Sequence, residues 1–332
     1  MPFVRIDARD HAAVAALTEF YNAARPVDDP TAPVAVPSLV AGELAYGWDL
    51  EPDESFFYYA DSEESPIGVL SMQLPQRDNR TLIWASITVR PDHRRRGHGS
   101  VMMKELFRRA TEAGRSILWV GLASDDPGGK AFVERFGFRY ANPDARRRQV
   151  LSEVDSEAVE RLFTGAVAKS ADYRLERLTP PYSDDLLSDL VDVTAAINDA
   201  PMGDLTFEDE HFDLARLKDF ETARAGRGDR IYRIVARHAG TGEIGGHTLV
   251  LVNPDRPEFG MQGDTAVARA HRGHRLGLLL KIDMLHWLAE AEPQLEVIET
   301  WNQADNAYMI NVNEAIGYRL NRIFDTYELT LS

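Results

Sequence analysis

The spacing of apolar residues divides the chain into short strands and helices. Residues 3–7 and 173–177 alternate apolar and charged side chains, as half-buried strands do. A helical spacing of apolar residues runs through 98–113 and again through 276–291. The same reasoning predicts helices over 11–24 and 183–199, strands over 55–60, 67–74, 117–121, 231–236, 244–252 and 297–300, and two strands that end at Val89 and Val267. This alternation of elements predicts an α/β fold, of the α+β kind, with a mixed sheet.

The elements recur in one order because the chain contains an internal repeat. Residues 87–99 match 265–277 in sequence, with a histidine and a final glycine at corresponding places. Downstream, 134–138 matches 314–318 at nearly the same separation. A long period of this kind is typical of a duplicated structural unit. We therefore predict an N-terminal domain over 1–151, a helical linker over 152–172 and a C-terminal domain over 173–332.

Composition and charge limit the classes of function. The 332 residues include no cysteine, which excludes disulfides, thiolate metal sites and a cysteine nucleophile. The first ten residues lack a signal-peptide core and no apolar run spans a bilayer, so we expect a cytoplasmic protein without a membrane partner. The net charge of −16 disfavours nucleic acid as a partner. Two short basic patches, 93–96 and 146–148, are interpreted as sites for a small anion.

The pattern Arg94-x-x-Gly97-x-Gly99 lies between a predicted strand and a predicted helix. Glycines let backbone N–H groups approach a diphosphate closely, and the following helix adds its positive N-terminal end. An ordinary strand-to-helix turn with a solvated basic cap is the alternative. The strand end, the arginine triplet and the start of the helix coincide here, which favours phosphate binding.

Residues 89–99 resemble the acyl-CoA loop of the GNAT acetyltransferases (GCN5-related N-acetyltransferases), whose pattern is Arg/Gln-x-x-Gly-x-Gly/Ala. The resemblance extends over both repeats and is closest to the tandem-domain members found in actinobacteria. It implies acetyl-CoA as the donor and the amine of a small molecule as the acceptor. It also implies a donor site made by Ile87, Thr88, Val89, Arg94, Arg95, Arg96, Gly97, His98, Gly99 and Ser100.

The second copy of the loop departs from this pattern. Arg275 stands where the first copy has Gly97, so a side chain occupies a position at which the backbone should approach phosphate. Arg275 either turns outward, contacts a phosphate itself, or marks a site that has been lost. The corresponding but weaker donor-site residues are Thr265, Val267, Arg272, Gly273, Arg275, Gly277, Asn302 and Asn306. For the two asparagines, helix capping is an equal alternative.

The groups that move protons are less clear from the sequence. The tyrosine that serves the family as an acid corresponds to Val133 and Asn313 here, so that role is not carried over. Asp264, at the start of a strand, is the candidate base, although a turn with Gln262 and Gly263 would also explain it. His247 is a weaker candidate, and an isolated histidine in a strand is more often structural. Direct attack by an amine that loses its proton to water needs no base.

Together these patterns predict acetyl transfer by direct attack in a ternary complex, without a metal. We expect the donor in the N-terminal domain and an acceptor pocket near 198–204. The alternatives are catalysis in the C-terminal domain, or a CoA-binding sensor or scaffold that does not turn over. The oligomeric state is expected to be a monomer or a homodimer, because two fused units can satisfy the pairing that single-domain relatives achieve by dimerising.

Overall fold

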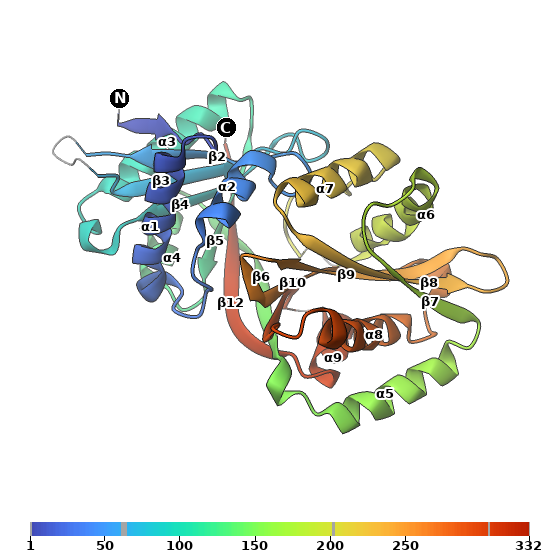
Figure 1. Cartoon of the computed structure of the whole chain (residues 1–332). Coiled ribbons are helices and arrows are strands. Elements are labelled where there is room, and N and C mark those ends of the chain that lie inside the picture. Colours follow the sequence, from blue (N-terminus) through green and yellow to red (C-terminus); the bar gives the residue numbers. More distant parts are fainter. Residues whose placement is uncertain (1, 61–64, 201–202, 305, 332) are drawn as a thin grey trace.

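All the strands lie in one mixed sheet that runs through the whole molecule (Figure 1). The computed structural model describes residues 2–60, 65–200, 203–304 and 306–331. In these parts the sheet has twelve strands in the order β1-β2-β3-β4-β5-β12-β6-β11-β10-β9-β8-β7. The predicted fold class is confirmed. Of the expected acceptor segment 198–204, residues 201–202 lie outside the described residues.

The elements of the first half follow the predicted order. They are β1 (Phe3–Arg5), α1 (His11–Asp28), α2 (Pro37–Tyr46), β2 (Glu54–Tyr58), β3 (Gly68–Gln73), β4 (Leu82–Val89), η1 (Pro91–His93), α3 (His98–Glu112), β5 (Ile117–Ala123), α4 (Pro127–Arg135) and β6 (Arg139–Val150). A short turn, η2 (Leu151–Glu153), and α5 (Ser156–Lys169) lead to the second half.

The second half repeats this order. Its elements are β7 (Tyr173–Leu178), α6 (Asp184–Ala195), η3 (Ala196–Asp199), α7 (Leu214–Gly226), β8 (Arg230–His238), β9 (Ile244–Asn253), β10 (Arg256–Val267), η4 (Arg269–His271), α8 (Leu276–Ala291), β11 (Val297–Gln303), α9 (Ala307–Ala315) and β12 (Arg319–Thr330). Within the described residues, no helix is both long and apolar enough to cross a membrane.

Alternation along the strands gives each half a core on both faces of the sheet. In the first half Phe56 and Leu70 pack toward α3, while their neighbours Phe57 and Val69 pack toward α1. In the second half α6 and α7 lie on one face of β8–β10 and α8 lies on the other (Figure 1). This arrangement follows from side chains pointing alternately to opposite faces. Each half therefore buries a helix layer on either side of its strands.

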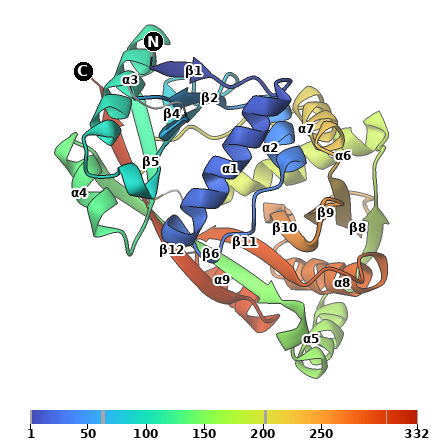
Figure 2. The ribbon, with the colours of Figure 1, turned by 60° about the vertical axis from the view of Figure 1, so that its left-hand side comes forward.

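The two halves exchange their closing strands. β6, from the first half, pairs with β11 of the second half, and β12, from the second half, pairs with β5 of the first. β6 and β12 also pair with each other, antiparallel, at the junction of the halves (Figure 2). Neither half completes its sheet with its own last strand. The segments 1–151, 152–172 and 173–332 therefore stay a proposal about repeat units, and we propose that the two units fold as one body.

The basic run 146–148 lies on β6 and serves this junction. The Arg146 side chain is 4% exposed and donates to both carboxylate oxygens of Asp29, at 2.5 and 2.9 Å. Arg148 donates to Glu299 at 2.7 Å, and Arg147 lies 3.5 Å from Glu314. The interpretation of this run as an anion site is wrong for Arg146 and Arg148, because their guanidinium groups are paired with carboxylates. Partners so far away in the sequence are set by tertiary structure.

Candidate active site between the two halves

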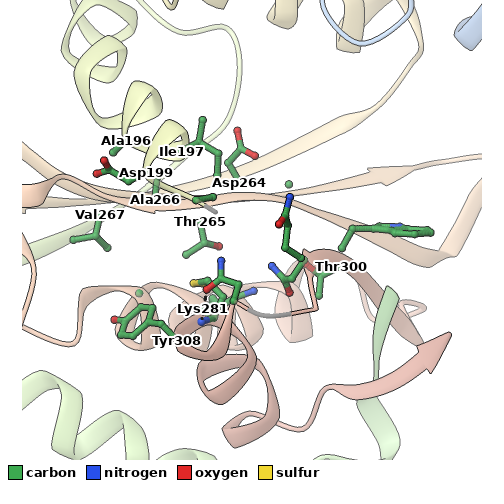
Figure 3. Close-up of a pocket in the computed structure, with 18 of the residues that line it drawn as sticks. Ala196, Ile197, Asp199, Asp264, Thr265, Ala266, Val267, Lys281, Thr300 and Tyr308 are labelled. Atoms are coloured by element: carbon green, nitrogen blue, oxygen red, sulfur yellow. Dashed lines mark hydrogen bonds between the residues drawn. The ribbon is translucent and has the colours of Figure 1, made fainter. Parts of the chain in front are cut away.

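A cavity of about 580 Å³ opens at the C-terminal copy of the loop (Figure 3). On one side it is bordered by the loop after β10, the start of α8, the end of β11 and the start of α9. On the other side it is bordered by η3, Asp264 and strands of the first half. The sequence ranked the N-terminal loop first, so the position of this cavity was not expected.

β10 and β11 separate where the cavity opens. Their parallel pairing runs only from Phe259–Val297 to Met261–Glu299 in the described register. Immediately afterwards β10 carries an extra residue against β9, between Gln262 and Thr265. Such a bulge bends a strand away from its neighbour. A Cβ atom at Gly263 would lie 2.6 Å from the Leu249 side chain, so a larger residue here would have to displace that side chain.

The first half does not repeat the bulge. There β3 and β4 stay in continuous register from Gly68–Val89 to Gln73–Trp84. Around the end of β4, Ile87 and Val89 pack against the apolar core, as do Leu122, Phe132 and Phe136. Phe132 lies 3.3 Å from where a Cβ atom of Gly99 would stand, whereas the nearest atom to the matching point at Gly277 is the Tyr308 hydroxyl, at 4.0 Å. The C-terminal loop therefore has more room for a ligand beside it.

Both loops have the same backbone shape despite their different sequences. Arg95 and Gly97 have φ angles of 63° and 91°, and the corresponding Gly273 and Arg275 have 86° and 57°. The left-handed positions therefore match, with the glycine and the arginine interchanged. Arg94 Nε donates to the carbonyl of Val89 at 2.8 Å, and Arg272 Nε donates to that of Val267 at 3.2 Å.

Arg275 does not block the loop. A Cβ atom added at the corresponding Gly97 meets no atom within 4 Å, so a side chain here points away from the rest of the chain. The Arg275 guanidinium indeed extends to α5, where Nη1 lies 3.5 Å from the Cβ position of Gly165. Of the three outcomes considered from the sequence, the structure has the side chain turned outward, although Arg275 still borders the cavity.

The first turns of α3 and α8 are suited to an anion. Within the described residues, no side chain caps either helix, whereas Asp10, Asp126, Ser183 and Asn306 each cap the helix that they precede. The N–H groups of an uncapped first turn need an acceptor, and a helix N-terminus favours a negative one. At α8 this turn lines the cavity, so the residues present fit the diphosphate of an acyl-CoA.

Arginines of both loops are engaged within the protein. Arg94 pairs with Asp28, the last residue of α1, at 2.7 Å. Arg269 and Arg272 pair with Asp199, at the end of η3, at 2.6 and 2.5 Å. These contacts attach the N-terminal loop to the end of α1 and the C-terminal loop to the end of η3. Asp199, expected from the sequence in the acceptor pocket, thus borders the cavity but holds arginines.

Asp264 lies on the bulge and points toward η3, on the opposite side of β10 from Thr265 and Lys281 (Figure 3). Burial, reinforced by the negative charge of Glu210, raises the pKa of its carboxyl group to about 6, which the cation of Arg233 partly opposes. A carboxylate with this pKa is ionised at neutral pH and can still accept a proton from a reacting amine. Asp264 lines the cavity, and its role as the base stays a prediction.

Three strands of the first half and the exchanged strand β12 of the second half form this side of the cavity. Trp84 of β4, Trp119 of β5, Asp144 of β6 and Thr326 of β12 all line it. Burial raises the pKa of the Asp144 carboxyl to about 6, opposed by a hydrogen bond from Thr326. Strand exchange brings these residues next to Asp264, so the cavity is completed only when both halves are present.

Three other sequence candidates, His247, Asn302 and Asn306, make contacts within the fold. His247 is completely buried, and burial together with the cation of Arg233 lowers its pKa to about 3, so it stays neutral and is no base near pH 7. Asn306 caps α9 by accepting from the N–H of Met309 at 3.2 Å. Asn302 accepts from Asn313, at the family's tyrosine position, at 2.8 Å. Both Asn302 and Asn306 also border the cavity.

Among the cavity residues that sequence reasoning missed, three carry polar groups that matter for the chemistry. Lys281 and Tyr308 are donor-side residues on α8 and α9, and Asp144 is on the acceptor side. Comparison of the repeats gave a signal for Lys281, since the matching residue is Met103. No such signal exists for Asp144, because its place depends on the exchange of strands.

Comparisons with known proteins agree with this geometry. The model of the acetyltransferase (GNAT) family matches residues 14–138. Among curated proteins, no sequence matches the chain. The fold is similar to that of a tandem GNAT protein from the clavulanic acid biosynthesis pathway, with a TM-score of 0.81 and 24% identity over 99% of this chain and 98% of the other.

A GCN5-related N-acetyltransferase from Sphaerobacter thermophilus is also similar, with a TM-score of 0.70 and 14% identity over 99% of this chain and 96% of the other. At such identities the likeness concerns the fold. The expected resemblance is therefore seen at two levels: residues 14–138 match the acetyltransferase (GNAT) family model, and the whole chain has a fold similar to that of a tandem GNAT protein.

Proposed function

We propose that the protein is an acyl-CoA-dependent N-acyltransferase whose transfer site is the cavity at the C-terminal loop. The supporting observation is that one cavity joins an uncapped helix N-terminus, a separated strand pair and a half-buried carboxylate. These are the features needed to hold a diphosphate, a thioester and an attacking amine in line. The resemblance to the family implies acetyl as the acyl group and a small-molecule amine as the acceptor.

The donor is held by backbone groups on the α8 side. N–H groups at the start of α8, beside Gly277, bind the diphosphate, and the Tyr308 hydroxyl lies close enough to donate to it. In the described register, the pairing of β10 with β11 ends at Met261. The edge of β10 beyond this residue therefore offers backbone N–H donors to the thioester. A donor aimed at the carbonyl oxygen stabilises the negative charge that develops there during attack.

Asp264 and the solvent move the protons. The amine nitrogen attacks the thioester carbonyl carbon, the carbon–sulfur bond breaks, and the amine's proton passes to the Asp264 carboxylate. Water protonates the departing CoA thiolate, since the family's tyrosine is replaced by Asn313, which is buried and bonded to Asn302. The products are an amide and CoA, and Asp264 returns its proton to water.

The acceptor side suits an amine that arrives as a cation. Trp84 and Trp301 are 45% and 41% exposed and border the cavity together with Trp119. Indole faces attract cations, and the carboxylates of Asp144 and Asp264 add negative charge. Because the two carboxylates are partly buried, their attraction for a cation is stronger than it would be in water.

Matched substitutions in the two loops test which loop binds the donor that reacts. Gly277→Glu places a carboxylate beside the diphosphate site at α8, and Gly99→Glu makes the same change at α3. Repulsion of like charges of this kind costs several kcal/mol, so we expect Gly277→Glu to weaken acetyl-CoA binding at least ~100-fold at its site and to cause the larger loss of thiol release with a panel of amines.

Calorimetry counts the donor sites, and a thiol reagent follows turnover. If Gly99→Glu abolished thiol release while Gly277→Glu did not, catalysis would belong to the N-terminal loop. If the wild-type protein bound acetyl-CoA but released no thiol with any amine, it would be a sensor or scaffold. The N-terminal loop keeps the backbone shape and the uncapped helix, which supports it as a second, non-reacting donor site.

A further inference from the structure

A buried lysine lies at the donor side of the cavity. Lys281, on α8, is 2% exposed, and its Nζ donates to Gln262 Oε1 at 3.0 Å. The same nitrogen lies 5.0 Å from the centre of the Tyr318 ring. Within the described part of the chain, no carboxylate forms an ion pair with it. Burial lowers the pKa of the Lys281 amine to about 7.

The N-terminal copy of the unit shows what this place normally contains. By the repeat, Met103 corresponds to Lys281 and Phe138 to Tyr318. Gln262 pairs with Val250 across β9–β10, and in the first half the residue that corresponds to Val250 is Met72, which pairs with Ala85 across β3–β4. By strand register, Ala85 therefore corresponds to Gln262. All three N-terminal residues are buried and apolar. The C-terminal half therefore groups Lys281, Tyr318 and Gln262 beside the cavity, where the N-terminal half has three apolar residues.

The geometry of Gln262 directs one acceptor at the lysine. Its amide nitrogen donates to the Leu249 carbonyl at 2.6 Å and contacts the Thr248 hydroxyl at 3.1 Å, which fixes Oε1 toward Nζ. One neutral acceptor and one aromatic face leave further donor capacity on an ammonium group. An isolated buried cation is costly unless an anion pairs with it. The lysine is therefore prepared for a negative group that enters the cavity.

The position decides which ligand brings that group. Lys281 lies on the same side of β10 as Thr265, Thr300 and Tyr308, where the donor is held, and opposite Asp264 (Figure 3). The diphosphate site is at the first turn of α8, and Lys281 lies more than one turn further along this helix, beneath the bulge. The negative group consequently belongs to the acyl end of the donor.

We propose that Lys281 binds a carboxylate at the end of the acyl group, so that the preferred donor is the CoA thioester of a dicarboxylic acid. This inference rests on the proposed function of the C-terminal cavity and refines its donor. The transfer chemistry is unchanged: the amine attacks the thioester carbon, CoA leaves, and the distal carboxylate stays on the product.

The test compares the affinities of succinyl-CoA, butyryl-CoA and acetyl-CoA by calorimetry, on the full chain carrying Gly99→Glu to remove the N-terminal site. A charge-assisted hydrogen bond corresponds to a preference of about 10- to 100-fold for succinyl-CoA over butyryl-CoA. Lys281→Met is the matched variant, because the chain itself tolerates Met103 at this place. It should abolish the preference while butyryl-CoA binds as well or better.

The outcomes separate this inference from the proposed function. Equal affinities for succinyl-CoA and butyryl-CoA in the wild-type background would overturn the inference, whether or not Lys281→Met folds. So would an equal loss of affinity for all three donors in Lys281→Met, or a stable acyl adduct on Lys281 detected by mass spectrometry. If instead Gly277→Glu left the binding of every donor unchanged, the proposed transfer site itself would fail.

Discussion

Replacing Asp264 by asparagine should change activity and stability in opposite directions. The carboxyl group has a pKa of about 6 in the folded protein, raised by burial from its ordinary value of 3.8. A rise of about two pKa units corresponds to about 3 kcal/mol, which is the upper limit of the cost of keeping the ionised group in the fold. Asparagine has nearly the same shape and no charge, so Asp264→Asn removes this cost.

The sign of the pH dependence follows from the raised pKa. The folded protein binds the proton of Asp264 more tightly than the unfolded chain, so stability is lost as the pH rises from about 4 to about 6. Above pH 6 we expect Asp264→Asn to be more stable than the wild type by at most about 3 kcal/mol. Below pH 4 this difference should disappear. Denaturant unfolding at several pH values measures it.

Activity should fall while stability rises. Loss of a general base typically lowers the rate by about 10²- to 10⁴-fold, and we expect a drop of this size in kcat/KM at pH 7.5. The ionisation of the amine affects both proteins equally, so the ratio of wild-type to variant kcat/KM isolates Asp264. That ratio should decrease about tenfold for each pH unit below 6. Thiol release with a reactive amine provides the measurement.

Asp144→Asn is the control, because burial raises the pKa of the Asp144 carboxyl to about 6 in the same cavity. Because Asp144 only attracts the amine in this proposal, Asp144→Asn should raise KM, while kcat keeps the pH dependence of the wild type. The assignment of the base is refuted if Asp264→Asn retains more than about a tenth of the activity and still shows the decrease in activity below pH 6. It is also refuted if that decrease below pH 6 disappears in Asp144→Asn instead.

Three further predictions concern the junction of the halves. Arg146→Met removes the buried cation that pairs with Asp29, and should lower the free energy of unfolding by about 3–5 kcal/mol in denaturant titrations; an effect under 1 kcal/mol would contradict this. Burial raises the pKa of Asp29, but the hydrogen bond from Arg146 outweighs burial and lowers the pKa to about 2. The stability that this pair contributes should therefore persist above pH 4 and be lost between about pH 4 and pH 2. Asp29→Asn should make the free energy of unfolding less dependent on pH in that range. The segment 1–172, produced alone, leaves β5 without β12 and should associate or aggregate, so a stable monomer in size-exclusion chromatography would argue against the strand exchange.

The elements were predictable because their signals are local. The start of α3 was expected at residue 98 and α8 over 276–291, as observed, because apolar spacing and the loop motifs mark them. α1 was expected to end at residue 24 and extends to Asp28, although Pro26 lies inside its last turn. Element order and the duplication followed from the same local patterns.

The choice between the two clefts was not predictable in this way. The loop motif gave priority to Gly97, yet backbone angles make Arg275 equivalent to it, and the volume beside each loop depends on Phe132 in one half and on the bulge at Gly263 in the other. A motif reports which residues occur along a loop. It does not report which distant side chains fill the adjoining space.

The sequence alone determined the repeat, the order of strands and helices and the candidate phosphate loops, because hydrophobic periodicity and glycine positions act over a few residues. Tertiary structure decided which strands close which sheet, and it thereby placed Trp84, Trp119 and Asp144 beside Asp264. It also paired Arg146 with Asp29 and put Lys281 against Gln262. The physical reason is that burial and charge pairing depend on neighbours in space, and the exchange of β6 and β12 brings together residues that no local pattern in the chain connects.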